Sequence, residues 1–256
     1  MAAYKQIQFE RKGGRADLTL DSPPENLLNV DMLEEIVDAL DPLRDDDTLK
    51  VLLIRGQGTV FCSGVILEDL QADRVGALMP NYSRMYDYLN KIRGLTVASV
   101  QGRAVGFGAE FASFCDVTIA AENAVFSFHH ITMGLFPPIA TAILPRLIGR
   151  NRALDWIVSG RNVSAMEAAE SHLIARVVPA LVLNDYSDRY VERIASFSAP
   201  AVVLAKRAVD QALYAPAMEA LRVTEATFMS DLMNSLDPHE GLRARIEGRL
   251  PVWRDR

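Results

Sequence analysis

Two adjacent histidines, His129 and His130, stand in the apolar run AVFSFHHITMGLFPP at residues 124 to 138. Imidazole readily gains or loses a proton near neutral pH, so it can take a proton from water or hold a water molecule in place. The run is typical of an extended segment, in which successive side chains point to opposite faces. Only one of the two histidines can therefore face a given site, and the other is expected to pack or to face solvent.

A glutamate is the second candidate for acid–base chemistry. Glu110 lies one turn into the apolar helix that is predicted for GFGAEFASFC. A carboxylate is rarely buried without a partner, and burial would raise its pKa towards neutrality, which suits a group that shuttles protons. The alternative is a glutamate near a helix start that is stabilised only by the helix dipole.

Two glycine-containing clusters could bring backbone N–H groups close to a ligand. VFCSGV at residues 60 to 65 follows a predicted strand, and GRAVGFGAEFASF at residues 102 to 114 runs from a strand into a helix. Amides at such turns can face a negatively charged oxygen. Neither cluster has the spacing of a phosphate-binding or dinucleotide-binding loop, so nucleotide hydrolysis and hydride transfer lose support. A tight turn without a ligand is the alternative for each cluster.

The elements that must position these residues alternate between strands and helices. Residues 7 to 21 predict a hairpin, and helical spacing from Val30 leads into a buried strand at residues 50 to 56. TVASVQG and VTIAA predict strands on either side of the Glu110 helix, whereas PPIATAILPRLIG and RALDWIVSG predict helices. This alternation indicates an α/β core with parallel strands. Residues 182 to 248 show only helical periodicity, so a helical region follows the core.

The composition argues against several classes of partner. The chain has 256 residues, half of them hydrophobic, and its 27 basic and 33 acidic residues give a net charge of -6. A substantial core is available, whereas a nucleic-acid surface is not expected. Cys62 and Cys115 are too few for a disulfide framework and lack metal-ligand spacing, so we expect a cytoplasmic protein without a metal site. We also expect neither a secretion signal nor a membrane span.

The chain resembles the crotonase (enoyl-CoA hydratase/isomerase) superfamily over nearly its whole length. The similar stretches are PPENLLNVDMLEEI, VFCSG, GRAVGFGAEFASFCDVTIAAENAVF, MGLFPP and IGRNRALDWIVSGRNVSAMEAAESHLIARVVP, followed by the C-terminal helices. MGLFPPIATAILPRLIGRNRAL and DPHEGLRARIEGRLPVW are most similar to hydratases of alicyclic dienoyl-CoA thioesters, of the cyclohexa-1,5-diene-1-carbonyl-CoA type. The resemblance implies a crotonase-like α/β spiral of ββα units in residues 1 to 195 and a C-terminal helical trimerisation region in residues 196 to 256. It also implies a homotrimer or a dimer of trimers, with coenzyme A as part of the substrate and no separate cofactor.

The resemblance also implies roles for particular residues. The backbone N–H groups of Val65 and Phe107 would form the oxyanion hole for a thioester carbonyl, and Glu110 would be the first of two hydratase carboxylates. The position of the second carboxylate falls on His130, because Phe126 and Gly134 match the family pattern on either side. With His130 as the base, the rate is expected to rise at about pH 6 to 7, where a histidine titrates.

Two departures from the family pattern narrow the chemistry. Phe136, Pro137 and Pro138 stand where some members carry a nucleophilic or basic aspartate, which argues against dehalogenation through an aspartate nucleophile. Ile66 replaces an aspartate that is expected soon after the first glycine cluster.

Further residues are candidates for binding the substrate. Those for the acyl pocket are Tyr82, Tyr86, Tyr88, Phe136 and Pro138, with helical packing as the alternative for the tyrosines. Arg249 and Arg254 could contact the phosphates of coenzyme A or form surface salt bridges instead. A buried structural thiol is expected for Cys62, and surface positions are expected for His172 and His239.

The expected function is a hydratase or lyase that acts on an unsaturated acyl-CoA, either open-chain or alicyclic, through a stabilised enolate, with Glu110 and His130 as an atypical pair. One alternative uses the same enolate for C–C bond hydrolysis, as in the ring opening of a β-diketone, or for isomerisation or decarboxylation. The other is a member that binds acyl-CoA without catalysis. A buried carboxylate with no function would lower stability, so Glu110 argues against this last alternative.

Overall fold

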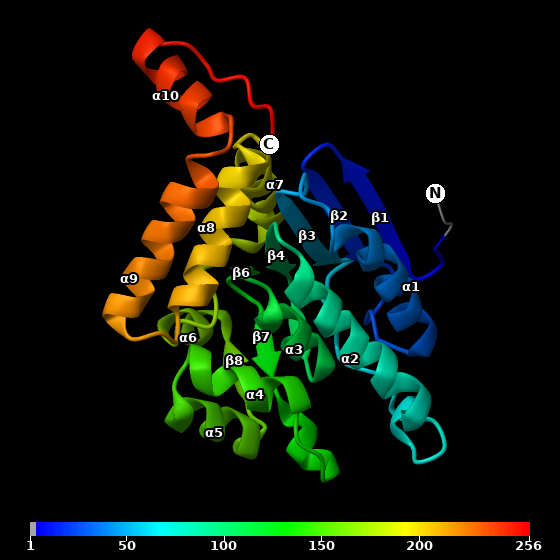
Figure 1. Ribbon diagram of the computed structural model, residues 1–256. Coiled ribbons are helices and arrows are strands. Elements are labelled where there is room, and N and C mark those ends of the chain that lie inside the picture. Colours follow the sequence, from blue (N-terminus) through cyan, green and yellow to red (C-terminus); the bar gives the residue numbers. More distant parts are fainter. Residues whose placement is uncertain (1–3) are drawn as a thin grey trace.

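The computed structural model describes residues 4 to 256, and its larger sheet has six strands (Figure 1). In spatial order they are β1 (Ile7–Lys12), β2 (Arg15–Leu20), β3 (Val51–Gly56), β4 (Leu95–Val100), β6 (Val117–Ala121) and β9 (Arg176–Val178). β1 and β2 form the antiparallel hairpin that was expected, and every later pairing in this sheet is parallel. The register places Ile7 opposite Leu20, so both buried side chains face the core.

A second sheet has three short strands, β5 (Arg103–Val105), β7 (Val125–Ser127) and β8 (Asn162–Ser164). β5 and β7 run parallel, with Val105 opposite Ser127, and the Gly106 N–H donates to the Ser127 carbonyl at 2.8 Å. Parallel strands end at the same edge of a sheet, so the segments that follow β5 and β7 emerge side by side. This sheet therefore brings the residues after Val105 next to the two histidines.

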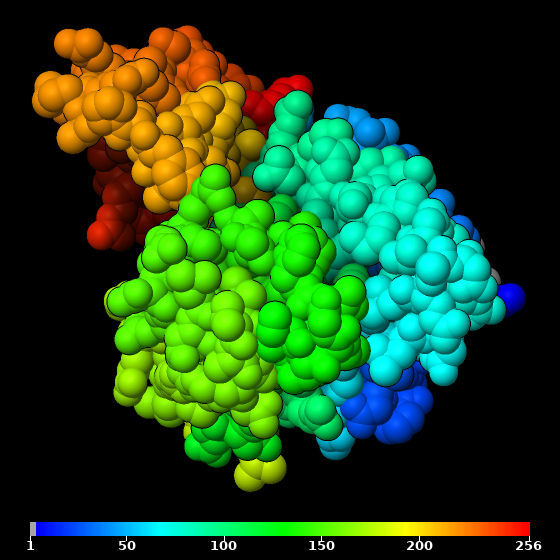
Figure 2. Space-filling view, turned by 90° about the horizontal axis from the view of Figure 1, so that it is seen from below, coloured from blue at the N-terminus to red at the C-terminus, as the bar shows by residue number. Residues whose placement is uncertain are grey.

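The helices of the core cover the sheets. They are α1 (Val30–Leu40), α2 (Val75–Lys91), α3 (Phe107–Phe114), α4 (Pro138–Leu147), α5 (Arg150–Ser159) and α6 (Ala165–Glu170), with 3-10 helices at Asp41–Leu43, Leu67–Leu70 and His129–Met133. The Asn29 side chain caps α1 by accepting the Met32 N–H. Nearly every residue of α3 is buried, because this helix lies in the interior beside β5 and α4. Figure 2 shows the α2 surface (cyan) adjoining the surface of α4 and its neighbours (green).

The C-terminal part is helical, as its periodicity predicted. It contains a 3-10 turn at Ala180–Val182, α7 (Leu183–Ala195), α8 (Ala199–Ala212), α9 (Ala217–Ala226), a π-helical segment at Thr227–Leu232 and α10 (Asp237–Glu247). α8, α9 and α10 form a lobe that projects from the core (Figures 1 and 2). The chain end returns to the core, where Asp255 pairs with Lys50 at 3.0 Å. Within residues 4 to 256, no helix combines the length and the apolar character needed to cross a membrane.

Candidate functional site

Glu110 is fully buried one turn into α3. Its Oε1 accepts the N–H of Ala140 at 2.7 Å, in the first turn of α4, where helical N–H groups have no partner within their own helix. Its Oε2 accepts the hydroxyl of Tyr82 at 2.5 Å. Burial raises the pKa of Glu110 to about 7, against the opposing effect of the hydrogen bonds from Tyr82 and Ala140. The carboxyl group can therefore gain and lose a proton near neutral pH.

His130 is the histidine that reaches this carboxylate. Its Nε2 lies 3.7 Å from Glu110 Oε2, which is beyond hydrogen-bond distance, and neither of its side-chain nitrogens has a partner within residues 4 to 256. Burial, followed by the neighbouring His129, lowers the pKa of His130 to about 4. At pH 7 the ring is neutral, so it can accept one hydrogen bond and donate another.

The local backbone differs from the extended run that the sequence suggested. β7 ends at Ser127, and His129 to Met133 form a 3-10 helix that Gly134 closes in the left-handed region with φ 74°. Side chains in a 3-10 helix are spaced by about 120°, so two neighbours still point in different directions. His129 is accordingly half-buried and does not reach Glu110, although its Nδ1 is buried without a partner in the described chain. Only His130 therefore reaches Glu110, whereas the His129 ring lies near the Gly106 turn, where its Cε1 would be 3.5 Å from a Cβ added to that glycine.

The backbone amides of Val65 and Phe107 lie on neighbouring segments. Phe107 is the first residue of α3 and follows Gly106, which has φ 57°. Val65 follows Gly64 (φ 120°), whose carbonyl accepts the Leu28 N–H at 2.8 Å. Neither amide donates to a protein group in the described part of the chain. A Cβ added to Gly106 would lie 3.9 Å from Gly64 Cα, 3.5 Å from His129 Cε1 and 3.7 Å from His130 Cε1, so the two free amides lie near both histidines.

Two of the α2 tyrosines form hydrogen bonds that lead to Glu110. Tyr82 donates to Glu110, and the Tyr86 hydroxyl donates to the Tyr82 oxygen at 3.1 Å. The four-residue spacing places both on one face of α2, which is the signal that could have paired them. Tyr88 lies elsewhere, with the Arg44 guanidinium 4.9 Å from its ring centre. Of the other two pocket candidates, Pro138 is half-buried at the start of α4, whereas Phe136 is 65% exposed.

The remaining candidates lie outside this cluster. Cys62 is buried, its thiol donates to the Gly64 carbonyl, and burial raises its pKa to about 12, so it is not a ready nucleophile. Arg249 pairs with Glu240 and Glu247. The exposed residues among the candidates include His172 and His239. Across residues 4 to 256, no three His, Cys, Asp or Glu side chains are grouped as metal ligands.

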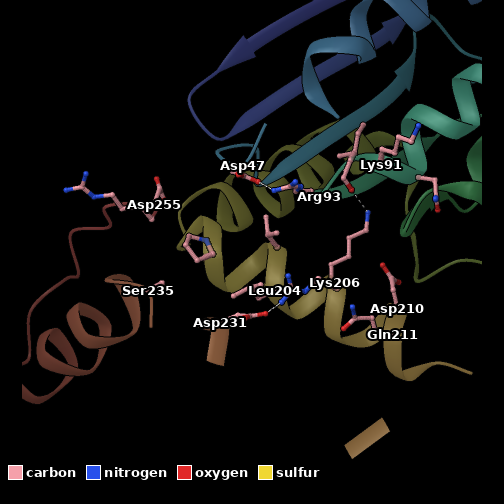
Figure 3. Close-up of a pocket in the computed structure, with 16 residues that line it drawn as sticks. Asp47, Lys91, Arg93, Leu204, Lys206, Asp210, Gln211, Asp231, Ser235 and Asp255 are labelled. Atoms are coloured by element: carbon pink, nitrogen blue, oxygen red, sulfur yellow. Dashed lines mark hydrogen bonds and ion pairs between the residues drawn. The ribbon is translucent and has the colours of Figure 1, made fainter. Parts of the chain in front are cut away.

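A groove of about 680 Å³ between α8 and the core is distinct from this site (Figure 3). Most of its charged side chains have partners, since Arg93 pairs with Asp47, Arg207 pairs with Asp231, and Lys206 lies 2.7 Å from Asp116. Figure 3 shows Arg93 beside Asp47, and Asp231 lies on the opposite side of the groove. A groove with paired charges is a poor anion site, so the chemistry is better placed at Glu110.

Known proteins share this fold and sequence pattern. A model of the enoyl-CoA hydratase/isomerase family matches residues 10–256. A probable enoyl-CoA hydratase from Rhizobium meliloti (strain 1021) is 32% identical over 257 residues, covering 99% of this chain and 100% of the relative. The 2,3-dehydroadipyl-CoA hydratase of Escherichia coli (strain K12) is 30% identical over 93% of this chain and 94% of its own.

Solved structures agree with the sequence comparisons. The crystal structure of an enoyl-CoA hydratase from Bacillus anthracis superposes with a TM-score of 0.91 at 28% identity, covering 98% of this chain and 100% of the other. The resemblance to the crotonase superfamily and the expected α/β fold are thereby confirmed. The chain belongs to the enoyl-CoA hydratase/isomerase family.

Proposed function

We propose that this protein adds water to the double bond of an unsaturated acyl-CoA thioester, with Glu110 and His130 as the pair that handles water and protons. The observation that carries the proposal is the 3.7 Å approach of His130 Nε2 to Glu110 Oε2 in a buried site. Two groups that face each other without a direct hydrogen bond can hold a water molecule or a reacting atom between them.

The mechanism begins with the thioester carbonyl. The N–H groups of Val65 and Phe107 would bind the carbonyl oxygen and stabilise the enolate as charge develops, by about 3 kcal/mol per donor. Ionised Glu110 takes a proton from the water, and the water oxygen bonds to Cβ while the electron pair of the double bond moves to the enolate. Glu110 then returns the proton to Cα, so the product contains all the atoms of water. Neutral His130 orients the water through one of its nitrogens.

The acyl group is expected to be alicyclic. The support comes from MGLFPPIATAILPRLIGRNRAL and DPHEGLRARIEGRLPVW, which are similar to hydratases of cyclic dienoyl-CoA thioesters. The named substrate of the E. coli relative is instead an open-chain dicarboxylic thioester. Cyclohexa-1,5-diene-1-carbonyl-CoA should therefore be tested beside crotonyl-CoA and a cyclic β-diketone. Mass spectrometry and NMR of the products separate hydration from ring opening, isomerisation and decarboxylation, and binding without turnover of any of them would indicate the non-catalytic alternative.

The pH dependence of turnover should follow Glu110. We expect kcat/KM to rise with pH through about 7, because Glu110 must lose its proton to act as a base, whereas His130 with a pKa of about 4 is neutral throughout. This assignment replaces the expectation that the rise in rate near neutral pH, the rising limb of the pH profile, reports the titration of His130. The His130→Gln variant should lose about 10²-fold in rate through a misplaced water, with the limb unmoved. Disappearance of the limb in that variant would show that His130 is the titrating base after all.

The proposed assembly is a trimer or a dimer of trimers, with residues 196 to 256 as the contact region. Its support is apolar surface on the C-terminal lobe, where several large side chains are more than half exposed: Val209, Leu213, Met218, Leu221, Phe228 and Met229. Sedimentation equilibrium should give three or six times the chain mass of 28.3 kDa. A monomer at micromolar concentration would contradict this assembly.

A further inference from the structure

A chain of two phenols ends on the carboxylate of Glu110. Tyr86 donates its hydroxyl to Tyr82 at 3.1 Å, and Tyr82 donates to Glu110 Oε2 at 2.5 Å. We propose that Tyr82, polarised by Tyr86, is a positioning residue that fixes the reactive oxygen of Glu110 and stabilises its ionised form. The proposal rests on the hydratase function, since it concerns the same carboxylate.

The hydrogen bonds of Glu110 show why one phenol can select the reactive position. A carboxylate oxygen has two lone-pair sites. The Ala140 N–H holds Oε1, and the Tyr82 hydroxyl takes one site on Oε2. The second lone-pair site on Oε2 remains free on the side of His130, whose Nε2 lies 3.7 Å from this oxygen. Tyr82 thus stops the carboxylate from rotating and leaves one lone pair towards the water.

Packing holds the two phenols in this arrangement. The ring centres of Tyr82 and Phe107 are 4.5 Å apart, and those of Tyr86 and Phe114 are 4.8 Å apart. Both tyrosines are buried, and burial raises both phenol pKa values well above the ordinary value, so they remain neutral donors. Hydrogen bonds in such a chain polarise one another, so Tyr86 makes Tyr82 a stronger donor.

The groups that face Glu110 are neutral, and Tyr82 is the side chain among them that donates to the carboxylate. α2 contributes Tyr82 and Tyr86, the 3-10 helix contributes neutral His130 with His129 behind it, and α4 contributes backbone N–H groups. No lysine or arginine contributes to the pKa of Glu110. The ionised carboxylate is therefore stabilised by two kinds of neutral donor, the backbone N–H groups of α4 and the Tyr82 hydroxyl.

The decisive variant is Tyr82→Phe, which removes the hydroxyl and keeps the ring. Since the lost hydrogen bond favours the ionised carboxylate, the rising limb of kcat/KM should move up by about one pH unit. At pH 7 this shift lowers the ionised fraction of Glu110 from about one half to about one tenth, so kcat should fall about 5-fold, with the KM for the thioester little changed. Tyr86→Phe should shift the limb in the same direction by a smaller amount, and it provides a second test should Tyr82→Phe fold poorly. Tyr88→Phe, a phenol of the same helix that lies under Arg44, is the matched control and should shift nothing.

A direct titration separates this inference from the proposed reaction. The carboxyl stretch of Glu110 is followed by infrared difference spectroscopy against Glu110→Gln, with no substrate present. An upward shift of this titration in Tyr82→Phe supports the positioning role, even if no thioester in the panel is hydrated and the proposed function fails. The opposite outcome is an active wild-type enzyme with a carboxyl titration and a pH profile that do not change in Tyr82→Phe or Tyr86→Phe. That result would overturn the positioning role and leave the proposed function intact.

Discussion

The Glu110→Gln variant should lose turnover by about 10²- to 10⁴-fold, the range for removal of a general acid–base group. The amide has nearly the same shape, but it can neither take the proton from water nor return it to Cα. Binding of a CoA thioester should survive, because the amides of Val65 and Phe107 are backbone groups that the substitution leaves in place. The loss is measured by turnover of the active thioester at pH 8, with binding followed by calorimetry. Wild-type kinetics in Glu110→Gln would contradict the proposed mechanism.

The same variant should be more stable than the wild type at alkaline pH. The pKa of Glu110 is raised from 4.5 to about 7 in the folded protein, so between these values the folded state holds a proton that the unfolded state has released. Stability is therefore lost as the pH rises through this window, by about 3 kcal/mol once the pH exceeds 7. Glutamine does not titrate, so Glu110→Gln avoids this loss.

Urea unfolding at pH 5 and pH 8 tests the sign of this effect. The gain from Glu110→Gln should be larger at pH 8 than at pH 5, whereas Glu170→Gln, at an exposed position on α6, should show no such difference. An equal change at both pH values would mean that Glu110 titrates alike in the folded and unfolded chains. A variant that is inactive but more stable at pH 8 would show that the buried carboxylate is retained for chemistry and not for the fold.

Hydrophobic periodicity predicted the strands and helices that are long enough to show a repeating pattern. The hairpin of β1 and β2, the buried strand β3 and helix α1 were expected, and each has at least six residues with a clear apolar pattern. β5 and β8 have three residues each, too few for a period of two to be recognised. Yet β5 is the strand that positions Phe107 at the site, so an element on which the site depends could not be recognised from its hydrophobic pattern.

The candidate site shows a similar division. The type and position of Glu110 indicated burial and a raised pKa, because a carboxylate in an apolar helix has few other environments. The hydrogen bond between Tyr82 and Glu110 joins residues 28 positions apart in the sequence. It depends on how α2 packs over α3, which no local sequence pattern encodes. The pKa of His130 likewise depends on burial by residues distant in the sequence, so its neutral state was not foreseen.

Gly108→Ala should disrupt the proposed oxyanion hole, although it adds only one methyl group. A Cβ at this position would lie 2.2 Å from the Cys62 carbonyl oxygen and 2.7 Å from the Cys62 Cβ, so the backbone must move. The Cys62 carbonyl accepts the Val105 N–H at 2.9 Å and so joins the two segments that carry Val65 and Phe107. Overpacking of this kind costs about 1 to 3 kcal/mol of stability, and a misplaced oxyanion donor costs about 10²- to 10³-fold in kcat.

The control for this variant is Gly76→Ala in α2, where a new Cβ would meet nothing within 4 Å. This change should raise stability by about 0.5 to 1 kcal/mol and leave the kinetics unchanged, since alanine favours a helix more than glycine does. Kinetics of Gly108→Ala are measured at a temperature where circular dichroism shows full folding, so that lost stability is not mistaken for lost catalysis. A folded Gly108→Ala enzyme with wild-type kcat would mean that the segments of Val65 and Phe107 can separate without harm. Their amides would then not be the donors that stabilise the enolate.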